Sequence, residues 1–504
     1  MAAQLRKILI ANRGEIALRV MRTCRELGIA SVAVYSEADR LAPHVSAADE
    51  AYCIGPPPSR ESYLRMDAII ETALRSAAAA IHPGYGFLSE NAAFARKVRE
   101  AGLVFIGPRA ESIAAMGDKT AARALVKAAG VPTVPGTDGA VRDIREAEDF
   151  CNRYGYPVLL KAAAGGGGKG MRVVRKASDL GPSFLAASSE AGSAFGDDRV
   201  YVEKYLEDPR HIEFQIFADH AGNTVHLGER ECSIQRRHQK VIEETPSVIV
   251  DDRMRRTMGE TAVNAARACG YENAGTIEFL VDGNRDFYFL EMNTRLQVEH
   301  PVTELRTGLD LVALQIAVAS GELLPFRQED VMFRGHAIEC RICAEDVENN
   351  YLPSTGRITH LRTPAGPGVR EDRGVNEGGE VSRYYDPMIA KLAVWGADRS
   401  AAIARMQRAL REYELLGVQS NIPLCMFVLG HPDFAAGNFT THFLEQKFDP
   451  RATRPADPAA DVAVAAVSAF LADEGREERA PAGDGTTTAA GRWRRLREEG
   501  MRNR

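Results

Sequence analysis

Cysteine is scarce in this sequence and forms no evident disulfide framework. The chain has 8 cysteines among 504 residues, scattered along its length, which is typical of reduced, buried thiols rather than of a disulfide-rich secreted protein. Cys340 and Cys343 have the spacing of a redox or zinc pair, but the sequence offers no second pair at metal-ligand spacing. We therefore expect two small, semi-buried residues in a strand.

Long apolar runs and a strong excess of one charge are also missing. No uninterrupted apolar run is long enough to cross a bilayer, and Met1 to Arg6 lack the layout of a secretory signal. A net charge of −6 argues against a dominant nucleic-acid surface. The sequence indicates a cytoplasmic protein of several domains with a large buried core.

Two common nucleotide-binding motifs are absent. The first expected strand-to-helix turn has a lone Gly14 where a dinucleotide fingerprint needs Gly-x-Gly-x-x-Gly. Residues 162–170 read Ala-Ala-Ala-Gly-Gly-Gly-Gly-Lys-Gly, without the Gly-Lys-Ser/Thr of a Walker A loop. Strand formers flank this run closely, so a flexible linker is less favoured than a glycine flap whose backbone approaches phosphate oxygens.

The apolar pattern predicts a different architecture at each end of the chain. Strands expected at residues 7–11, 31–35, 78–81 and 104–106, with helices between them, indicate a parallel sheet. The turn-rich residues 82–91 form either a ligand-facing loop or a stiff connector. Towards the other end, strands at 335–342, 356–361 and 388–395 and a helix at 399–413 predict an α+β domain, followed by a largely disordered tail with one docking helix.

A predicted β-hairpin organises the middle of the chain. Residues 275–281 and 287–293 are strand-like, and the turn-rich segment 282–286 separates them. If the hairpin is centred between Asn284 and Arg285, Glu278 lies opposite Glu291, and Asn293 falls on the same face. Two facing carboxylates repel, so an edge hairpin with solvated acids competes with a site in which a cation bridges them.

The residues after the hairpin favour the cation site. Arg295, Gln297 and Glu299 follow at intervals of two and share one face if the chain stays extended. A cluster of oxygen ligands suits Mg²⁺ or Mn²⁺ bound together with substrate phosphates. Residues 232–240 are rich in donors and contain no carboxylate, so they are either a solvated face or contacts to the γ-phosphate and an anionic substrate.

These segments together resemble biotin carboxylase, the ATP-grasp component of biotin-dependent carboxylases. The likeness extends from about Arg6 to Phe448, through the motifs at residues 10–17, 82–91, 235–240 and 291–301 and the glycine flap. It implies α/β and α+β domains: a Rossmann-like N-terminal domain at 1–115, an ATP-grasp domain at 116–330 with a mobile lid at about 132–205, and a C-terminal domain at 331–448. Residues 449–504 would be a low-complexity tail.

The resemblance also implies a role for individual residues. Glu278, Glu291 and Asn293 would hold the metal ions. Lys240, Arg295 and Val298 would bind bicarbonate, Glu299 would be its general base, and Arg341 would bind biotin. Contacts to ATP would come from Lys119, Lys161, Gly167, Gly168, Glu203, Lys204, Tyr205, Leu206, His211, Gln235 and His238, together with Glu278 and Glu291.

The implied reaction suits these residue types. Glu299 would deprotonate bicarbonate while Lys240 and Arg295 hold the resulting anion near the γ-phosphate of ATP. Mg²⁺ (or Mn²⁺) would neutralise charge on the phosphates. Carboxyphosphate would break down to CO₂ and phosphate, the phosphate would deprotonate biotin, and Arg341 would stabilise the biotin enolate.

The sequence contains no Met-Lys-Met of a biotinyl domain. We therefore expect biotin to arrive on a separate carrier protein, with a carboxyltransferase on another chain, as in an acetyl-CoA or other acyl-CoA carboxylase of fatty acid biosynthesis. Relatives are often homodimers, and we expect neither nucleic-acid nor membrane binding. Two alternatives are another ATP-grasp ligase that activates bicarbonate or a carboxylate, and a non-catalytic nucleotide-binding scaffold. The strand that carries Arg341 argues against the first, and the retention of Lys240 and Glu299 against the second.

Overall fold

The computed structural model describes residues 5–137, 139, 141, 143–162, 171–195, 198–237, 239–450 and 466–467. The chain divides into two units, 1–449 and 450–504, and every element below belongs to the first. The predicted glycine flap and most of the predicted tail lie outside the described residues, although Ala466 and Val467 are helical. Among the described helices, none is both long enough and apolar enough to span a membrane.

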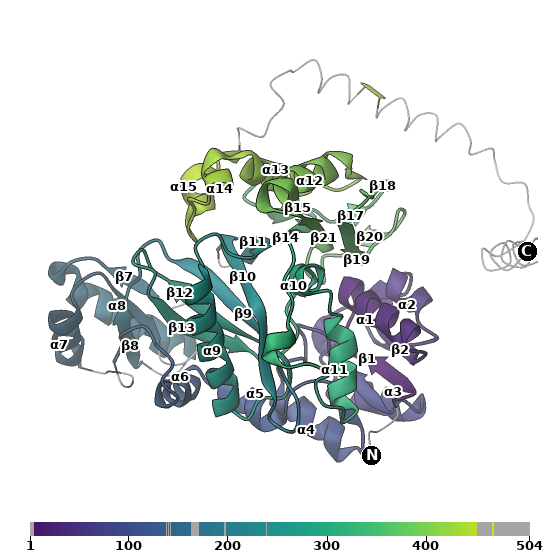
Figure 1. The fold of residues 1–504 in the computed structure, drawn as a ribbon, viewed down its shortest axis with the longest axis horizontal. Coiled ribbons are helices and arrows are strands. Elements are labelled where there is room, and N and C mark those ends of the chain that lie inside the picture. Colours follow the sequence, from purple (N-terminus) through teal and green to yellow (C-terminus); the bar gives the residue numbers. More distant parts are fainter. Residues whose placement is uncertain are drawn as a thin grey trace, which may run out of the picture. The chain divides into compact units, whose positions relative to one another are not determined.

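The first part of the chain forms the predicted parallel sheet (Figure 1). Its strand order is β3-β2-β1-β4-β5, and its apolar side chains pack against the helices on its faces. The strands are β1 (Lys7–Ile10), β2 (Ala30–Ser36), β3 (Glu50–Gly55), β4 (Ala80–His82) and β5 (Val104–Phe105). The helices are α1 (Gly14–Glu26), α2 (Pro43–Ala47), α3 (Met66–Arg75), α4 (Ala92–Glu100) and α5 (Ala110–Gly117).

A small antiparallel sheet follows, which we call the lid sheet. Its strands are ordered β7-β6-β8, and two helices supply the rest of its apolar core. The glycine-rich run lies between β6 and β7, as predicted for a flap that joins two strands. The elements are α7 (Ile144–Tyr154), β6 (Val158–Ala162), β7 (Arg172–Val174), α8 (Leu180–Phe195) and β8 (Val200–Lys204), and the preceding helix α6 (Lys119–Ala128) packs outside this core, with α9 (Asp252–Ala268) and strands of the larger sheet.

An eight-stranded sheet, which we call the central sheet, holds the candidate site. Its order is β13-β12-β9-β10-β11-β14-β21-β19, so strands from the middle and the end of the chain form one continuous ladder. The first five positions are taken by β13 (Phe287–Asn293), β12 (Asn273–Val281), β9 (Arg210–Ala218), β10 (Thr224–Arg236) and β11 (Gln239–Thr245). The last three are β14 (His336–Cys343), β21 (Met388–Gly396) and β19 (Val369–Arg373).

Helices cover this sheet along its length (Figure 1). Helix α9 (Asp252–Ala268) packs its apolar face on β9 and β10, where Met258 and Ala262 are fully buried. At the other end, α12 (Arg399–Glu412) packs against β21 and β14, which confirms the helix predicted at 399–413. The remaining helices are α10 (His300–Thr307), α11 (Leu311–Ala319), α13 (Ile422–Gly430), α14 (Pro432–Ala436) and α15 (Phe443–Lys447).

Short two-stranded ladders complete the C-terminal part. They pair β15 (Glu345–Asp346) with β16 (Leu352–Pro353), β17 (Gly356–Arg357) with β20 (Glu380–Val381), and β18 (His360–Arg362) with β22 (Glu414–Leu416). The strand expected at 356–361 is therefore two short strands, because the chain leaves one ladder and joins another. All eight cysteines are free. Cys340 is fully buried in β14 and Cys343 is half-buried, whereas Cys53 is exposed, so not all of the thiols are buried as predicted.

Candidate functional site

A cavity of about 1000 Å³ opens between the N-terminal part, the lid sheet and the central sheet. Tyr85 and Phe87 from the turn-rich loop 82–91 line it, and so does Tyr385 from the C-terminal part. Many of the predicted site residues also line it: Lys161, Glu203, Lys204, Tyr205, Leu206, His211, Gln235, Lys240, Glu278, Glu291, Asn293, Arg295, Val298 and Arg341. Residues that are far apart in the sequence thus share one cavity.

The predicted pairing across the hairpin is confirmed, although a register shift between Glu278 and Phe279 centres the turn on Asn284 and not between Asn284 and Arg285. Glu278 of β12 lies directly opposite Glu291 of β13, and Thr276 lies opposite Asn293. Asn293 donates from Nδ2 to Glu278 Oε1 over 2.8 Å, so the amide and the carboxylate share a face as expected. Asp282 closes the turn by accepting hydrogen bonds from the backbone N–H groups of Asn284 and Asp286.

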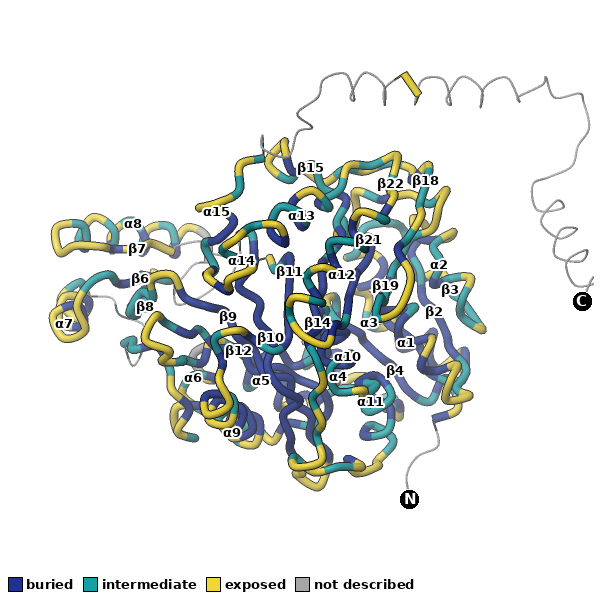
Figure 2. Tube along the Cα trace, turned by 45° about the horizontal axis from the view of Figure 1, so that its top comes forward, coloured by how far each residue is buried: buried dark blue, intermediate teal, exposed yellow. Residues whose placement is uncertain are grey.

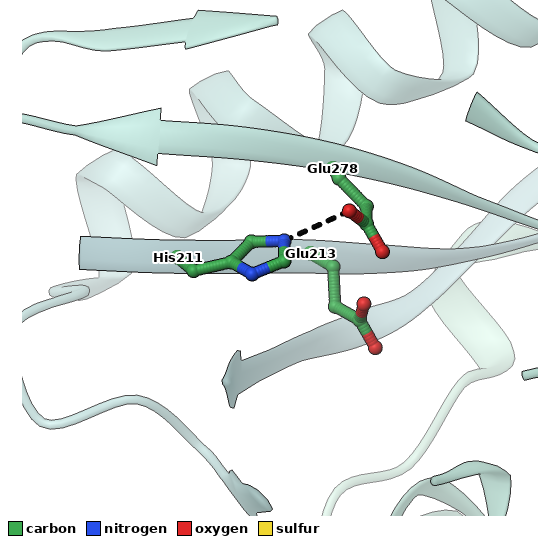
Figure 3. A group of neighbouring side chains, drawn as sticks. All are labelled: His211, Glu213 and Glu278. Carbon is green, nitrogen blue, oxygen red and sulfur yellow. Dashed lines mark hydrogen bonds and ion pairs between the residues drawn. The ribbon is translucent and has the colours of Figure 1, made fainter. Parts of the chain in front are cut away.

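Glu278 is buried beside a histidine. His211 of β9 points its Nε2 at Glu278 Oε2, 2.9 Å away, and Glu213 lies two residues further along the same strand (Figure 3). Burial alone would raise the pKa of Glu278, but Lys240 and His211 together hold it well below its usual range. Ligand atoms of His211, Glu213 and Glu278 all lie within 4.8 Å of one another, which is a spacing that a cation can bridge.

The ammonium group of Lys240 occupies the centre of this acidic cluster. Its Nζ lies 2.5 Å from Glu213, 2.8 Å from Glu278 and 2.7 Å from Glu299. Burial would lower the pKa of Lys240, yet the three carboxylates raise it well above its usual value. The lysine is therefore a permanent cation, and its position shows that this group of oxygen atoms accepts positive charge.

Glu299 is fully buried between two cations. Its Oε1 accepts a hydrogen bond from Lys240, and its Oε2 accepts one from Arg341 Nη2 over 3.0 Å. Burial raises the pKa of Glu299, but Lys240, Arg341 and Arg230 lower it well below its usual range. Arg341 also donates from Nε to Glu243 over 2.6 Å. The structure thus holds a deprotonated carboxylate against the two cations that the resemblance assigns to bicarbonate and biotin.

The segment after the hairpin is a loop rather than an extended strand. Strand β13 ends at Asn293, and Glu299 immediately precedes α10, so Arg295, Gln297 and Glu299 do not share a strand face. They converge instead through side-chain contacts. Arg295 donates to Asn293 and Gln297, and Gln297 donates to Glu278 Oε1 over 3.0 Å. The prediction of an extended chain is therefore wrong here: the chain turns before α10, whose first turn contains a proline.

The turn-rich loop 82–91 supports this segment. Glu90 accepts the backbone N–H of Thr294 over 2.9 Å and Arg295 Nε over 2.8 Å. The N-terminal part therefore holds the first half of the loop 294–299. Residues 82–91 act as more than a connector, because they both line the cavity and fix Arg295.

The lid sheet contributes a second, less buried group. Lys161 of β6 and Glu203 of β8 form an ion pair, with side chains 30% and 11% exposed. Lys204 donates to the backbone carbonyl of Tyr156 over 2.9 Å. The side chain of Lys119, at the start of α6, lies outside the described residues, as do Gly167, Gly168 and His238.

Sequence reasoning missed two residues of the cluster. Glu213 is fully buried and bridges Lys240 and Arg230, and Arg230 in turn contacts Gln215 and Thr303. The signal for Glu213 was its place two residues after His211 in an alternating strand, which puts both on one face. Arg230 offered no such signal, because its partners come from three separate segments.

Comparison with known proteins identifies relatives along almost the whole chain. Residues 4–113 match the family described as biotin carboxylase, N-terminal domain. Residues 118–327 match the ATP-binding domain of the carbamoyl-phosphate synthase L chain, and residues 339–446 match the biotin carboxylase C-terminal domain. The first match covers the parallel sheet. The second covers the lid sheet and most of the central sheet, and the third covers the C-terminal part.

Individual relatives are similarly close. The biotin carboxylase of Nostoc sp. is 54% identical over 440 residues, which cover 87% of this chain and 98% of that protein. A pyruvate carboxylase subunit from Methanothermobacter thermautotrophicus is 56% identical over 440 residues, which cover 87% of this chain and 89% of that protein.

Solved structures show the same likeness. The biotin carboxylase domain dimer of Hydrogenobacter thermophilus 2-oxoglutarate carboxylase, in complex with MgADP, ADP and bicarbonate, superposes with a TM-score of 0.83 at 48% identity, covering 90% of this chain and 99% of that one. A Campylobacter jejuni biotin carboxylase complex gives a TM-score of 0.83 at 49% identity, covering 88% and 99%.

Proposed function

The chain belongs to the biotin carboxylase family, and from this premise we propose how its own residues carry out the ATP- and bicarbonate-dependent carboxylation of biotin. The enzyme is an ATP-dependent ligase with the N-terminal, ATP-grasp and C-terminal domains of that family. We place the domain boundaries at 1–115, 116–330 and 331–448, with the lid at about 132–205 and a tail at 449–504. The observation that carries the proposal is the contact of Glu299 with both Lys240 and Arg341.

Glu299 is the general base in the first step. Its pKa lies well below the usual range because of Lys240, Arg341 and Arg230, so it is ionised and has no proton to lose before it can accept that of bicarbonate, although the same cations weaken it as a base. Lys240, Arg295 and the backbone of Val298 hold the anion. One bicarbonate oxygen then attacks the γ-phosphorus, the bond to ADP breaks, and carboxyphosphate forms.

The acidic hairpin suits a divalent metal ion. Glu278, Glu291 and Asn293 offer oxygen ligands, and the contact of the Lys240 ammonium with Glu278 supports a site that attracts positive charge. Mg²⁺ or Mn²⁺ bound there would bridge phosphate oxygens and neutralise their charge during phosphoryl transfer. His211 orients the Glu278 carboxylate towards that position.

The remaining contacts to ATP come from α6, from the lid and the residue after it, and from β9 and β10 and the segment after β10. Side chains, and at the glycines the backbone, would hold the phosphates and the adenosine. The residues of this group whose side chains the structure describes line the same cavity. We assign this role to Lys119, Lys161, Gly167, Gly168, Glu203, Lys204, Tyr205, Leu206, His211, Gln235 and His238.

Arg341 acts in the second step. Carboxyphosphate breaks down to CO₂ and phosphate, and the phosphate removes the proton from the ureido nitrogen of biotin. That nitrogen attacks CO₂ while negative charge gathers on the ureido oxygen, where a fixed guanidinium stabilises it. Glu243 and Glu299 hold Arg341 in place from two sides, so no reorganisation is needed as the charge develops.

Biotin reaches the cavity on a separate carrier protein, and a carboxyltransferase on another chain uses the product. The relative from Methanothermobacter thermautotrophicus supports separate chains because its name describes one subunit of a carboxylase. The Hydrogenobacter thermophilus structure is named as a dimer, which supports a homodimer here. We place the complex in the cytoplasm. The choice of acyl-CoA or keto-acid acceptor belongs to the transferase.

Steady-state hydrolysis of ATP by the purified chain tests the proposal. With Mg²⁺ present, we expect hydrolysis to depend on bicarbonate and to be stimulated by free biotin, with carboxybiotin as the product. An ATP-grasp ligase of another kind would require an amine or other acceptor in place of biotin. Hydrolysis that ignores both bicarbonate and biotin would contradict the assignment.

A further inference from the structure

Lys391 of β21 is a buried cation that the proposed mechanism does not use. Its side chain is 0% exposed. It lies directly opposite Arg341 on the neighbouring antiparallel strand, so both side chains project from the same face of the central sheet. Val298 and Arg341 line the cavity, whereas Lys391 is not among the described residues that line it. Lys391, like Glu299, is buried and does not itself line the cavity.

Its contacts join three segments of the chain. Lys391 Nζ donates to the backbone carbonyl of Val298 over 2.9 Å. A carboxylate oxygen of Glu15, at the start of α1, lies 3.2 Å from the same Nζ, but neither oxygen of Glu15 has a hydrogen-bond partner in the described structure. The directed interaction thus goes to Val298, and Glu15 supplies opposite charge.

Arg341 and Lys391 together hold two consecutive residues of the loop 294–299. Arg341 contacts the Glu299 carboxylate, while Lys391 contacts the Val298 carbonyl. Glu90 fixes the other end of the loop through Thr294 and Arg295. A buried lysine is costly even when it is paired, so its retention calls for a benefit that an apolar side chain would not provide.

We infer that Lys391 is a positioning residue for bicarbonate, which fixes the Val298 backbone so that the loop 294–299 presents its anion-binding groups to the cavity. The inference rests on the proposed role of Val298 and Arg295 in binding bicarbonate. It predicts that loss of the Lys391 donor loosens the grip on bicarbonate and leaves the ATP contacts of the lid unchanged, because those contacts lie on separate elements.

The test compares Lys391→Met with the double variant Glu15→Gln/Lys391→Met. The double variant also replaces Glu15, which loses its cationic neighbour in the single variant. Burial raises the pKa of Glu15 to about 7 against the opposing effect of Lys391, so loss of Lys391 favours the protonated carboxyl, which glutamine resembles. We expect both variants to raise the KM for bicarbonate about tenfold or more, with the KM for ATP nearly unchanged. Lys391→Arg, which keeps a donor, should recover part of the loss.

Arg399→Met is the matched control. Arg399 pairs with Glu244 and donates to the carbonyls of Phe434 and Ala435, so its loss also removes a partly buried cation that holds backbone carbonyls. It lies outside the cavity-lining set. We expect a lower thermal midpoint and an unaltered KM for bicarbonate.

The outcomes separate the inference from the proposed function. If the wild-type chain shows no bicarbonate-dependent ATP hydrolysis, the proposed function fails. If the wild type is active and the double variant regains the wild-type KM for bicarbonate, Lys391 only balances charge and the inference is overturned. If Lys391→Met is too unstable to purify, the double variant, which lacks the buried Glu15 carboxyl, decides the result.

Discussion

The lid sheet and the central sheet both carry proposed ligands, but they hold them differently. Glu213 and Glu278 of the central sheet, and Glu299 of the adjoining loop, have side chains that are 0–5% exposed, and all three contact Lys240. In the lid sheet, Lys161 is 30% exposed and has Glu203 as its partner. Figure 2 shows the same contrast, with β9, β10 and β12 buried and much of α7 and α8 exposed.

This difference separates two tasks. Buried charges interact strongly because little water screens them, and a network of several partners fixes each side chain. Such a network suits bicarbonate activation, in which atoms must be aligned to react. A half-exposed ion pair is screened and contributes less, which suits a nucleotide that must enter and leave. Substitutions in the two sheets should therefore differ in what they damage.

The largest effect is expected from Glu299→Gln. Glutamine keeps an acceptor for Lys240 but cannot take the proton of bicarbonate, so bicarbonate-dependent turnover should fall about 10²- to 10⁴-fold. ATP affinity, measured by equilibrium binding, should stay near that of the wild type. Glu231→Gln is the control, because Glu231 is an equally buried glutamate that binds Arg210 and Ser247 outside the cavity. Turnover close to that of the wild type in Glu299→Gln would show that Glu299 is not the base.

A smaller and more selective effect is expected from Arg341→Ala. Carboxylation of free biotin should fall about 10²-fold, because the guanidinium no longer meets the charge on the ureido oxygen. Bicarbonate-dependent ATP hydrolysis without biotin should fall less. Arg341→Lys restores the charge but not the two-pronged contact with Glu243 and Glu299, so it should recover only part of the rate. An equal loss of both activities would place Arg341 in the first step instead.

The smallest effect is expected in the lid. Lys161→Met should raise the KM for ATP about tenfold, which corresponds to about 1.4 kcal/mol, and leave the KM for bicarbonate unchanged. Lys176→Met is the control, since Lys176 is an exposed lid lysine that lies 3.9 Å from Asp179 and away from the cavity. A large rise in the KM for bicarbonate in Lys161→Met would show that the two sheets do not divide the work as described.

Local sequence signals were sufficient for the hairpin. The turn-rich segment at Asp282 separates the two strands as predicted, and a register shift between Glu278 and Phe279 then places Glu278 opposite Glu291. The parallel sheet and α12 followed similarly from apolar periodicity. These features depend on neighbours in the sequence, so the sequence predicted them without knowledge of the fold.

Long-range charge pairing was beyond the sequence. The partners of Arg230 come from β9, β12 and α10, and Lys391 meets Glu15 from the opposite end of the chain. The prediction of an extended chain at 294–299 was wrong because Arg-x-Gln-x-Glu alternates like a strand. Contacts with Glu90 and Lys391 hold these residues in a turn instead. Tertiary contacts decided these positions, and no local pattern records them.

The pairing of β11 with β14 has a consequence for the two proposed steps of biotin carboxylation. Ile242 lies opposite Cys340 and Glu243 opposite Glu339, so Lys240 and Arg341 stand on neighbouring strands of one hydrogen-bonded ladder. Neighbouring strands are about 4.8 Å apart, and that spacing cannot change unless the ladder breaks. Backbone pairing thus fixes the separation of Lys240, proposed to act where carboxyphosphate forms, from Arg341, proposed to act where biotin captures CO₂. No hinge between these two strands can increase that separation.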